Sequence, residues 1–369
     1  MSSFEPVRVA IVGCGSIATN GYQPRLLTYK HRVELVGYFD EDRARAEALT
    51  KAAGGGKVYK SLDEVLSDSS VEAVLNTTTL PAHHPVSLKA IKAGKHVYSE
   101  KPLAENMAQA DELIAAAEAK GVKFGSAPSS PLGYEQQETW KRIRAGQFGK
   151  IFSVVGNFSC TRLESWHPNA DVFLNSGLGV VSDAAPYPLI MMTTILGPVK
   201  RVFGFSTVAM PERVLLQGPR EGTKFNVSVP DHNLGLLEFE SGAKGFVMAS
   251  WSGRNKVPSF EMQGPEGTIA VNPHNDGEGI ETYSLRQGDW KKEEPHPKSH
   301  KGLDWGKGVV DLACAIRENR APRCNAKQGR HILEIASALI DSTKTGQSVE
   351  VKSRFPSPEP IGEVAPWDA

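Results

Sequence analysis

The sequence has few cysteines, no excess charge of either sign and no long hydrophobic run. Its four cysteines among 369 residues are scattered and lack the short paired spacing of a zinc or dithiol site. Basic and acidic residues number 42 each, so charge does not favour nucleic acid or an anionic membrane as a partner. No apolar run reaches the roughly 18 residues that span a bilayer, and residues 1–7 lack the features of a signal peptide. We therefore expect a soluble, cytoplasmic protein with a small, mostly neutral ligand and no metal ion.

The chain is long enough for two hydrophobic cores, and its pattern of segments predicts two domains. Up to about residue 125, short β-branched runs alternate with helical stretches, as in a parallel sheet covered by helices. After Pro131, strand-like segments with glycine-rich turns dominate, and Ser241-Gly242 predicts a tight antiparallel hairpin. The sequence therefore predicts an α/β domain followed by an α+β domain with a mostly antiparallel sheet. The predicted ranges are 1–125 for the first domain, 126–355 for the second and 356–369 for a proline-rich C-terminal tail.

A glycine-rich turn follows the first predicted strand. Residues 13–18 have the G-x-G-x-x-A spacing, in which glycines permit a sharp turn and a close approach of a pyrophosphate to a helix N-terminus. Asp40 ends the second strand, where a carboxylate accepts hydrogen bonds from the adenosine ribose and repels a 2′-phosphate. The pattern predicts a Rossmann fold that binds NAD in preference to NADP, although Arg43 and Arg45 are near enough in sequence to meet a 2′-phosphate. The predicted cofactor-binding residues here are Gly13, Gly15, Ser16, Ile17 and Asp40. The alternative is an ordinary strand-to-helix turn with Asp40 as a helix cap.

The most specific motif is the string Ala-Gly-Lys-His-Val-Tyr-Ser-Glu-Lys-Pro over residues 93–102. It resembles the Gfo/Idh/MocA family, the relatives of glucose–fructose oxidoreductase and inositol dehydrogenase, and the resemblance extends over nearly the whole chain to about Phe355. Its other matching positions are Thr77-Thr78-Thr79, His83, the segment from Asp183 to Tyr187, Gly264 to Gly267 and the closing helices. The resemblance implies a Rossmann domain followed by a mostly antiparallel sheet domain, with nicotinamide and substrate meeting between them.

Lys101 is the residue to which the resemblance assigns the chemistry. It implies that this lysine lies beside the reacting carbon and its oxygen, and that Thr78, His83, Glu100 and Lys101 belong to the cofactor site. An ammonium at a strand end of an open α/β sheet can hydrogen-bond the substrate oxygen as charge develops during hydride transfer. Glu100 then orients Lys101 or the nicotinamide side of the site, and a cis Lys101-Pro102 bond is compatible with the motif. Without the family string, Glu100 and Lys101 would be interpreted as a surface ion pair.

The second-domain candidates are Asp183 and Tyr187, which stand where relatives carry an aspartate and, four residues on, a histidine or tyrosine. A phenol can accept the alcohol proton when a nearby cation, here Lys101, favours its ionised form. The glycine run before Asp183 is reduced to Gly177 and Gly179, and alanines follow Asp183 where relatives usually carry a glycine. The alternative roles are a helix-entry cap for Asp183 and a core aromatic for Tyr187.

Trp166 and His167 lie in a Glu-Ser-Trp-His-Pro-Asn segment over residues 164–169 that resembles one subgroup of the family. An indole face suits the apolar face of a sugar ring, and an imidazole can bond its hydroxyls. Both residues are therefore predicted to bind substrate, with His167 as a second candidate for the general base. Simple packing of the two rings is the alternative.

Together these patterns predict a cytoplasmic enzyme, an NAD-dependent sugar or polyol dehydrogenase or reductase that acts on CH–OH groups. The predicted catalytic residues are Lys101, Tyr187 and Asp183, and the predicted substrate-binding residues are Lys101, Trp166, His167, Asp183 and Tyr187. Two alternatives stay open: a glycoside-modifying enzyme that recycles its bound NAD, and a non-catalytic regulator of the same fold that senses NAD and sugar. Because family members usually pair subunits through the second-domain sheet, a homodimer or homotetramer is expected, with the strand over 245–251 as a candidate surface.

Overall fold

The computed structural model describes residues 4–167, 169–254 and 259–368 of the chain. Two compact units emerge from it. Unit 1 comprises Met1–Leu132, Leu303–Arg330 and Pro358–Ala369, and unit 2 comprises Gly133–Gly302 and His331–Ser357. The chain therefore passes back and forth between the units, and each unit is assembled from segments that are far apart in the sequence.

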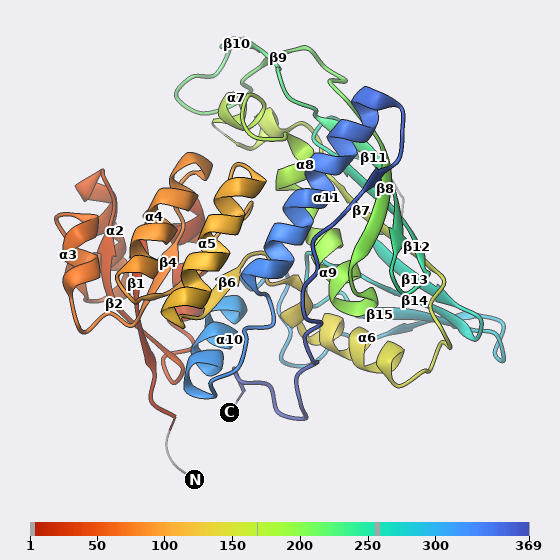
Figure 1. Ribbon diagram of the computed structural model, residues 1–369, viewed down its shortest axis with the longest axis horizontal. Coiled ribbons are helices and arrows are strands. Elements are labelled where there is room, and N and C mark those ends of the chain that lie inside the picture. Colours follow the sequence, from red (N-terminus) through yellow and green to blue (C-terminus); the bar gives the residue numbers. More distant parts are fainter. Residues whose placement is uncertain (1–3, 168, 255–258, 369) are drawn as a thin grey trace. The chain divides into compact units, whose positions relative to one another are not determined.

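Unit 1 contains a parallel sheet, in which six strands are described in the order β3-β2-β1-β4-β5-β6. Figure 1 labels β1, β2, β4 and β6. Every neighbouring pair runs parallel. The strands are β1 (Val7–Val12), β2 (Val33–Phe39), β3 (Lys57–Val58), β4 (Ala73–Asn76), β5 (His96–Ser99) and β6 (Phe124–Ser126). The central strands β1 and β4 are almost completely buried, as expected for a sheet that helices cover on both faces. The predicted α/β fold is confirmed.

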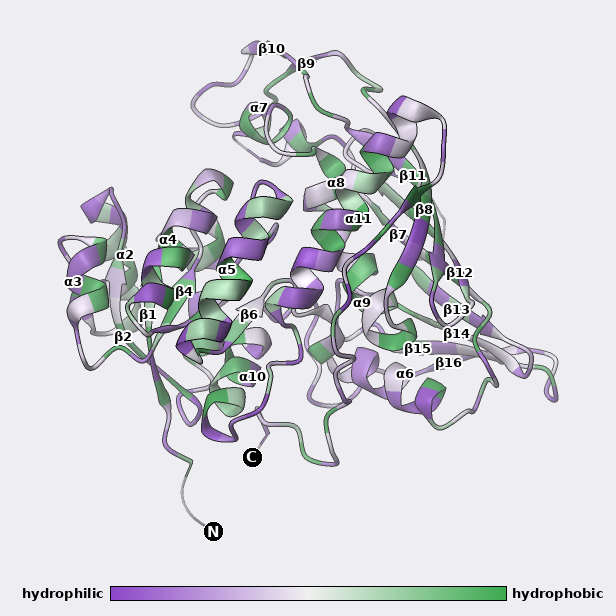
Figure 2. Cartoon of the chain, in the orientation of Figure 1, coloured by the Kyte–Doolittle hydropathy of each residue, from purple (hydrophilic) through white to green (hydrophobic). Residues whose placement is uncertain are grey.

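The helices of unit 1 begin and end at residues suited to those positions. They are η1, a π-helical turn (Ala18–Tyr22), α1 (Gln23–Leu26), α2 (Arg43–Ala53), α3 (Leu62–Ser67), α4 (Leu80–Lys92), α5 (Met107–Lys120), η2 (Ser130–Leu132) and α10 (Gly306–Arg317). Asp42, Ser61 and Asn106 cap α2, α3 and α5 by accepting hydrogen bonds from first-turn N–H groups. Gly54 and Gly121 end α2 and α5 in the left-handed conformation. Figure 2 shows that α4 and α5 each carry hydrophobic and hydrophilic stretches, as amphipathic covering helices do.

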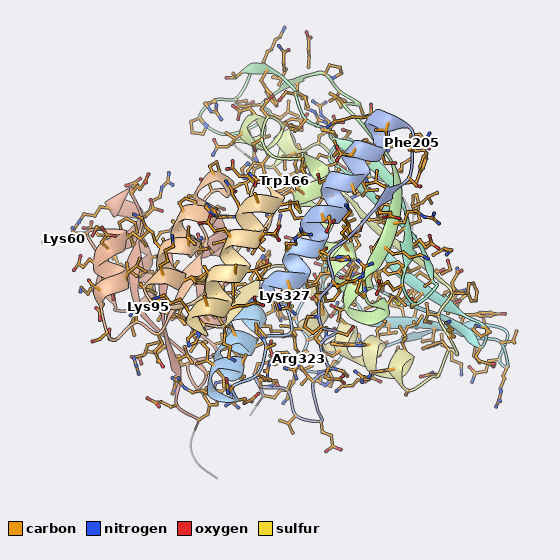
Figure 3. All side chains as sticks on the ribbon, viewed as in Figure 1. Lys60, Lys95, Trp166, Phe205, Arg323 and Lys327 are labelled. Carbon is orange, nitrogen blue, oxygen red and sulfur yellow. The ribbon has the colours of Figure 1, made fainter. Side chains whose placement is uncertain are left out.

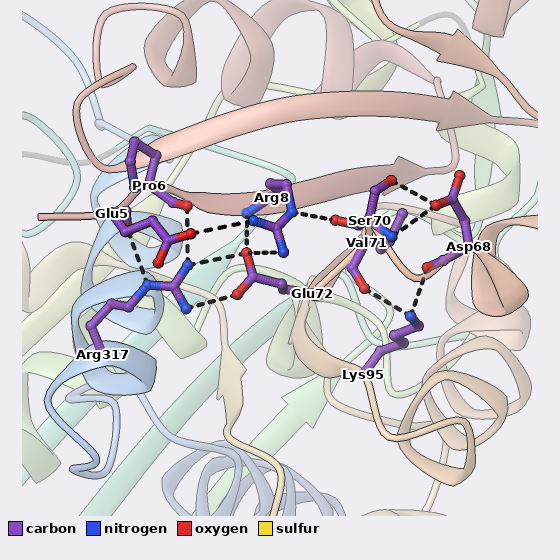
Figure 4. Close-up of polar contacts among 9 residues, drawn as sticks. All are labelled: Glu5, Pro6, Arg8, Asp68, Ser70, Val71, Glu72, Lys95 and Arg317. Atoms are coloured by element: carbon purple, nitrogen blue, oxygen red, sulfur yellow. Dashed lines mark hydrogen bonds and ion pairs between the residues drawn. The ribbon is translucent and has the colours of Figure 1, made fainter.

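Helix α10 packs in unit 1, although the sequence placed residues 303–330 in the second domain. It contacts β2, β5, β6 and α1. Arg317, in its last turn, donates to the carbonyl oxygens of Glu5 (2.9 Å) and Pro6 (3.0 Å) and to both carboxylate oxygens of Glu72 (2.7 and 3.1 Å), as Figure 4 shows. Arg8 of β1 joins the same carboxylate through its backbone N–H at 3.0 Å. These long-range bonds attach the helix to the first strand of the sheet.

The proline-rich tail also belongs to unit 1, beginning at residue 358. Ile361 and Trp367 are buried. Arg32 donates to the carbonyl oxygen of Pro366 at 2.7 Å, and Arg323 donates to that of Glu359 at 2.9 Å. The tail that composition marked as separate is thus held to the rest of unit 1 through its backbone.

Unit 2 is built around a second sheet, with nine described strands in the order β16-β15-β14-β13-β7-β12-β11-β8-β17. Its strands are β7 (Ser153–Ser159), β8 (Val199–Thr207), β11 (His232–Phe239), β12 (Lys244–Ser250), β13 (Phe260–Gly264), β14 (Gly267–Val271), β15 (Ile280–Ser284), β16 (Trp290–Glu293) and β17 (Val349–Glu350). Adjacent strands are antiparallel except β7 and β12, which run parallel. The predicted mostly antiparallel sheet is confirmed, and β11 and β12 form the hairpin predicted at Ser241-Gly242.

The helices of unit 2 and a small hairpin complete it. They are α6 (Tyr134–Arg144), η3 (Leu163–Ser165), α7 (Ala170–Phe173), α8 (Val180–Asp183), α9 (Pro186–Leu196), the greater part of α11 (Ala326–Thr345), and the strand pair β9 (Glu212–Val214) and β10 (Lys224–Asn226). Helix α9 lies on β7, where Gly156 makes room for it: a Cβ there would stand 2.4 Å from Met192 and 2.7 Å from Pro188. Within the described part of the chain, no helix is long and apolar enough to cross a membrane.

Candidate active site

The glycine turn after β1 has the backbone that the motif requires. Gly13 has φ +92°, and a Cβ on it would lie 2.6 Å from the backbone nitrogen of Thr78, so both its conformation and its packing demand glycine. Gly15 is different, because a Cβ there would meet nothing within 4 Å. Gly13 is thus pressed against the end of β4, while Gly15 borders open space. Ser16 is exposed and Ile17 is partly exposed at the start of the following helix.

Asp40 reaches the same turn from the end of β2. Its Oδ2 accepts a hydrogen bond from the backbone N–H of Cys14 at 2.7 Å, and its Oδ1 accepts one from the N–H of Asp42 at 2.8 Å. Burial and then the Asp40 charge raise the pKa of the Cys14 thiol to about 12, so this cysteine stays a neutral packing group. The carboxylate is partly exposed and has lone pairs left for further donors.

The two arginines near Asp40 are engaged within α2. Arg43 pairs with Glu47 at 2.7 Å, and Arg45 pairs with Asp42 at 3.3 Å. Both are exposed ion pairs, which are weak. Each guanidinium nonetheless has a carboxylate of the protein itself as its partner.

A buried polar network lies at the carboxyl ends of β4 and β5. Asn76 donates to the carbonyl oxygen of His83 (3.0 Å) and to Ser87 (2.9 Å), and accepts from the hydroxyl of Thr78 (2.6 Å). The His83 ring lies between two carbonyl oxygens, with Nδ1 2.8 Å from that of Pro102 and Nε2 3.0 Å from that of Thr78. Burial lowers the pKa of His83, which favours a neutral ring that donates one of these two bonds at a time. His83 is thus a buried link between the β4 turn and the segment after Lys101.

Glu100 connects that segment to the helix of the glycine turn. One of its oxygens accepts a 2.6 Å hydrogen bond from the hydroxyl of Tyr22, and the other accepts a 3.0 Å bond from the backbone N–H of Lys101. Its own N–H donates to the carbonyl oxygen of Asn76 at 2.9 Å. Glu100 is buried, Lys101 is partly exposed, and the Lys101-Pro102 bond is cis, as the motif allowed.

In unit 2, Tyr187 stands at the start of α9 within an aromatic cluster. Its ring stacks on Phe158 of β7 (centroids 5.2 Å apart, planes at 21°) and meets His274 edge to face (5.0 Å, 83°). Phe158 and His274 also contact each other at 4.2 Å. Burial lowers the pKa of His274 to about 3, so this imidazole is neutral. Two rings therefore restrict the plane of Tyr187.

Asp183 ends α8 and interacts electrostatically with the turn before it. Its negative charge raises the pKa of Cys160, which burial has already raised, to about 11. Burial lowers the pKa of His167, while Asp183 and Asp171 oppose that change. Asp183, Cys160 and His167 are therefore near one another, whereas Tyr187 belongs to the neighbouring aromatic cluster.

Trp166 and His167 follow the short turn η3. Their backbone N–H groups both donate to the carbonyl oxygen of Leu163, at 3.2 and 2.9 Å. The indole of Trp166 is 54% exposed and is labelled in Figure 3. The His167 ring packs edge to face on Phe173 at 4.6 Å, and its Nδ1 accepts a 3.1 Å bond from the N–H of Asn169. A neutral His167 therefore carries its proton on Nε2 and presents a donor there. The next residue of the motif, Pro168, lies outside the described residues.

The predicted residues thus form one group in each unit. Unit 1 holds Gly13, Gly15, Ser16, Ile17, Asp40, Thr78, His83, Glu100 and Lys101, and unit 2 holds Trp166, His167, Asp183 and Tyr187. Sequence reasoning missed Tyr22, Phe158 and His274. No local pattern marks them, since each acquires its role through a contact 29 or more residues away along the chain. Within residues 4–167, 169–254 and 259–368, no group of histidine, cysteine, aspartate and glutamate side chains forms a metal site.

Comparison with known proteins identifies relatives along most of the chain. The chain is 24% identical to 1,5-anhydro-D-fructose reductase of Ensifer adhaerens over 327 residues, which are 87% of this chain and 92% of that protein. It is 28% identical to levoglucosan dehydrogenase of Pseudarthrobacter phenanthrenivorans over 232 residues, covering 56% of this chain and 57% of that one. A solved levoglucosan dehydrogenase in complex with NADH and levoglucosan has the same fold, with a TM-score of 0.81, 20% identity and coverage of 94% of this chain and 100% of that chain.

Two domain models of one family match successive parts of the sequence. The first, described as "Oxidoreductase family, NAD-binding Rossmann fold", matches residues 7–127, and the second, the C-terminal domain of the same family, matches residues 137–270. Together they cover well over half of the chain. The chain therefore belongs to the Gfo/Idh/MocA oxidoreductase family.

Proposed function

We propose that this protein is an NAD-dependent dehydrogenase or reductase that transfers a hydride between nicotinamide and a carbon of a carbohydrate, polyol or glycoside. Two of its relatives are named for reactions of 1,5-anhydro-D-fructose and levoglucosan. The observation that carries the proposal is the anchoring of Lys101. Its backbone N–H is bonded to buried Glu100, and the same carboxylate accepts the hydroxyl of Tyr22 from the helix of the glycine turn.

This anchoring supports a role for Lys101 at the cofactor. The glycine turn and Lys101 both follow the carboxyl ends of parallel strands, which is the edge of an open α/β sheet where ligands bind. A lysine whose backbone is tied to the dinucleotide helix keeps its position relative to a nucleotide held there. The ammonium would hydrogen-bond the substrate oxygen and stabilise the negative charge that develops on it.

The residues of the glycine turn fit NAD as the cofactor. Open space beside Gly15 can admit a pyrophosphate, and the remaining lone pairs of Asp40 can accept the ribose hydroxyls. The Asp40 charge opposes a 2′-phosphate, and Arg43 and Arg45 already have carboxylate partners. When bound, NAD supplies the hydride acceptor in the oxidative direction.

In that direction the chain has to remove the hydroxyl proton as the hydride leaves carbon. We assign proton acceptance to Tyr187, whose ring plane is held by Phe158 and His274. The reverse proton transfer serves carbonyl reduction. Asp183, at the end of α8, is assigned to the substrate hydroxyls.

Trp166 and His167 are assigned to sugar recognition. The exposed indole offers a flat apolar surface for a sugar ring. The tautomer of His167 favours donation from Nε2 to a sugar oxygen, so we assign it hydrogen-bond donation in place of the base role. Both groups suit a neutral substrate.

The experiment that tests this function replaces Lys101 and measures turnover and cofactor binding separately. With levoglucosan plus NAD and 1,5-anhydro-D-fructose plus NADH as first members of a panel of neutral sugars, we expect Lys101→Met to lower kcat roughly a thousandfold, as loss of an oxyanion-stabilising group does. NADH affinity, measured by fluorescence titration, should change less than threefold. Lys92→Met, on the exposed last turn of α4, is the matched control and should retain full activity. Undiminished turnover in Lys101→Met would contradict the mechanism, and NADH binding without turnover of any sugar would favour a sensor.

We also propose that a second copy of the chain covers the outer face of the unit 2 sheet. The strands β8, β11 and β12 align an apolar row there, formed by Phe203, Phe205, Leu234, Leu236 and Phe246. Phe205 (labelled in Figure 3) and Leu236 are 61% and 56% exposed. A row of this kind is typical of subunit interfaces. Light scattering should give a multiple of the 40.0 kDa chain mass, and Leu236→Glu should lower it.

A further inference from the structure

Arg213, on β9, is a fully buried cation that joins three separate segments of unit 2. Its guanidinium donates to Glu164 Oε2 at 2.7 Å, to Asp231 Oδ2 at 2.5 Å and to the hydroxyl of Ser252 at 2.6 Å. The side chains of Arg213, Glu164 and Asp231 have no exposed surface. Asp231 immediately precedes β11, and Ser252 follows the end of β12. Two of these three hydrogen-bond acceptors of Arg213 are therefore attached to strands of the sheet.

The third acceptor, Glu164, lies in the turn η3 that precedes Trp166 and His167. Its other oxygen, Oε1, accepts a 2.7 Å bond from Arg162. Arg162 has φ +38°, a conformation that residues with a side chain rarely adopt. Backbone strain of this kind persists only where surrounding contacts hold it. Here the carboxylate of Glu164 provides such contacts, because it accepts hydrogen bonds from the guanidinium groups of both Arg162 and Arg213.

The network is poorly explained as a source of stability alone. Withdrawing a guanidinium and two carboxylates from water carries a large desolvation cost, and well-packed apolar residues often stabilise a core as well. Within the described residues, the Nε atom of Arg213 has no hydrogen-bond partner, so the network is not even fully satisfied. Apolar contacts are not directional and would not fix the orientation of η3 relative to the sheet. The planar guanidinium of arginine does so, because it bonds several acceptors in a fixed geometry.

We propose that Arg213 is a positioning residue for sugar recognition, which holds the Trp166–His167 turn in register with the sheet through Glu164. This inference rests on the proposed function, in which those two side chains bind the sugar. Arg213 itself has no exposed side-chain surface and does not contact substrate.

The test compares Arg213→Lys with the unaltered protein. Lysine keeps the charge but cannot reproduce the planar fork. We expect KM for the sugar to rise roughly ten- to hundredfold, the size of effect that a small displacement of binding groups produces, with a smaller change in kcat and an unchanged NADH affinity. Amide hydrogen exchange over residues 163–167 should accelerate at least tenfold, while exchange in β1 and β4 stays the same.

Arg142→Lys is the matched control. Arg142, on α6, forms a similar fork with Glu293 in unit 2, at 2.6 and 2.8 Å, and has no bond to η3. It should leave both the sugar KM and the exchange of residues 163–167 unaltered. Equal effects from the two arginines would mean general loosening of unit 2 and would overturn the proposal.

A second variant guards against failure of Arg213→Lys to fold. Glu164→Gln preserves the size of the side chain and one acceptor oxygen but removes its charge, and we expect the same faster exchange over residues 163–167. Unchanged exchange and sugar KM in a folded variant would overturn the proposal. The exchange measurement requires no turnover, so if the unaltered protein proves inactive on every sugar, the function fails while the positioning role is still decided.

Discussion

The carboxylate of Asp40 is bonded to the backbone N–H of Cys14 at 2.7 Å, across 26 residues of sequence. One side chain therefore both holds the glycine turn in shape and places a negative charge beside it. The hydrogen bond needs only an acceptor oxygen, whereas exclusion of a 2′-phosphate needs the charge. The two contributions can be separated by an isosteric substitution.

Asp40→Asn should preserve the turn and weaken the preference for NAD. The amide oxygen can still accept from Cys14, while the bond that Oδ1 accepts from the N–H of Asp42 is lost. The repulsion of a 2′-phosphate is removed, so we expect NADP affinity to rise about tenfold, equivalent to about 1.4 kcal/mol. NAD affinity should fall less than that. Titration of both cofactors measures the ratio. Glu41→Gln, on the exposed neighbouring residue, removes the same charge and should leave the ratio unchanged; an unaltered ratio in Asp40→Asn as well would show that Asp40 does not select the cofactor.

Tyr22→Phe should impair catalysis more than its cost in stability suggests. Loss of the buried hydroxyl deprives Glu100 of a donor and should lower the free energy of unfolding by about 1–2 kcal/mol. Because Glu100 also holds the backbone of Lys101, kcat should fall roughly tenfold. Tyr29→Phe is the comparison, since the hydroxyl of Tyr29 donates to Asp304 at 2.5 Å in the same unit. It should cost similar stability and leave kcat intact; equal kcat losses in both variants would argue against the link through Glu100.

The Arg317–Glu72 pair should make stability sensitive to acid. Burial alone would raise the pKa of Glu72, but the hydrogen bonds and charges of Arg317 and Arg8 prevail and lower it from 4.5. A lowered pKa in the folded state means that the stabilisation is present above about pH 4.5 and is lost as the pH falls through the folded value. The free energy of unfolding, measured with urea, should therefore decrease as the pH is lowered below about 4.5.

In Arg317→Met this acid dependence should be shallower. At neutral pH the variant should also lose about 2 kcal/mol, because a partly buried carboxylate is left with fewer donors. Arg43→Met, which removes an exposed pair on α2, should lose less than about 1 kcal/mol. If the stability of Arg317→Met depended on acid as steeply as that of the unaltered protein, carboxylates other than Glu72 would be responsible for the dependence.

Local patterns in the sequence were sufficient for the sheet of unit 1 and for its glycine turn. Alternation of β-branched runs with helical stretches reports which segments are buried, and Gly13 is required by the φ of its own residue. For the same reason the hairpin at Ser241-Gly242 was predictable, since a turn depends on a few consecutive residues. These features depend on short stretches of chain.

The division into units was not predictable in this way. Helix α10 lies between the two sequence segments of unit 2, but Arg317 bonds it to residues more than 200 positions earlier, in unit 1. The pattern of an amphipathic helix indicates that one of its faces is buried, but it does not indicate which sheet covers that face. The proline-rich tail likewise gave no signal for its contact with Arg32.

The sequence by itself determined the fold class, the family and the candidates with distinctive motifs, because backbone geometry, periodicity and the residue string ending in Glu100-Lys101-Pro102 are local properties. Only the tertiary structure decided what surrounds those candidates: Tyr22 on Glu100, Phe158 and His274 on Tyr187, and Arg213 beneath the turn of Trp166 and His167. Such contacts join segments that are distant in the sequence. They form only when the whole core packs, so no short stretch of sequence can specify them.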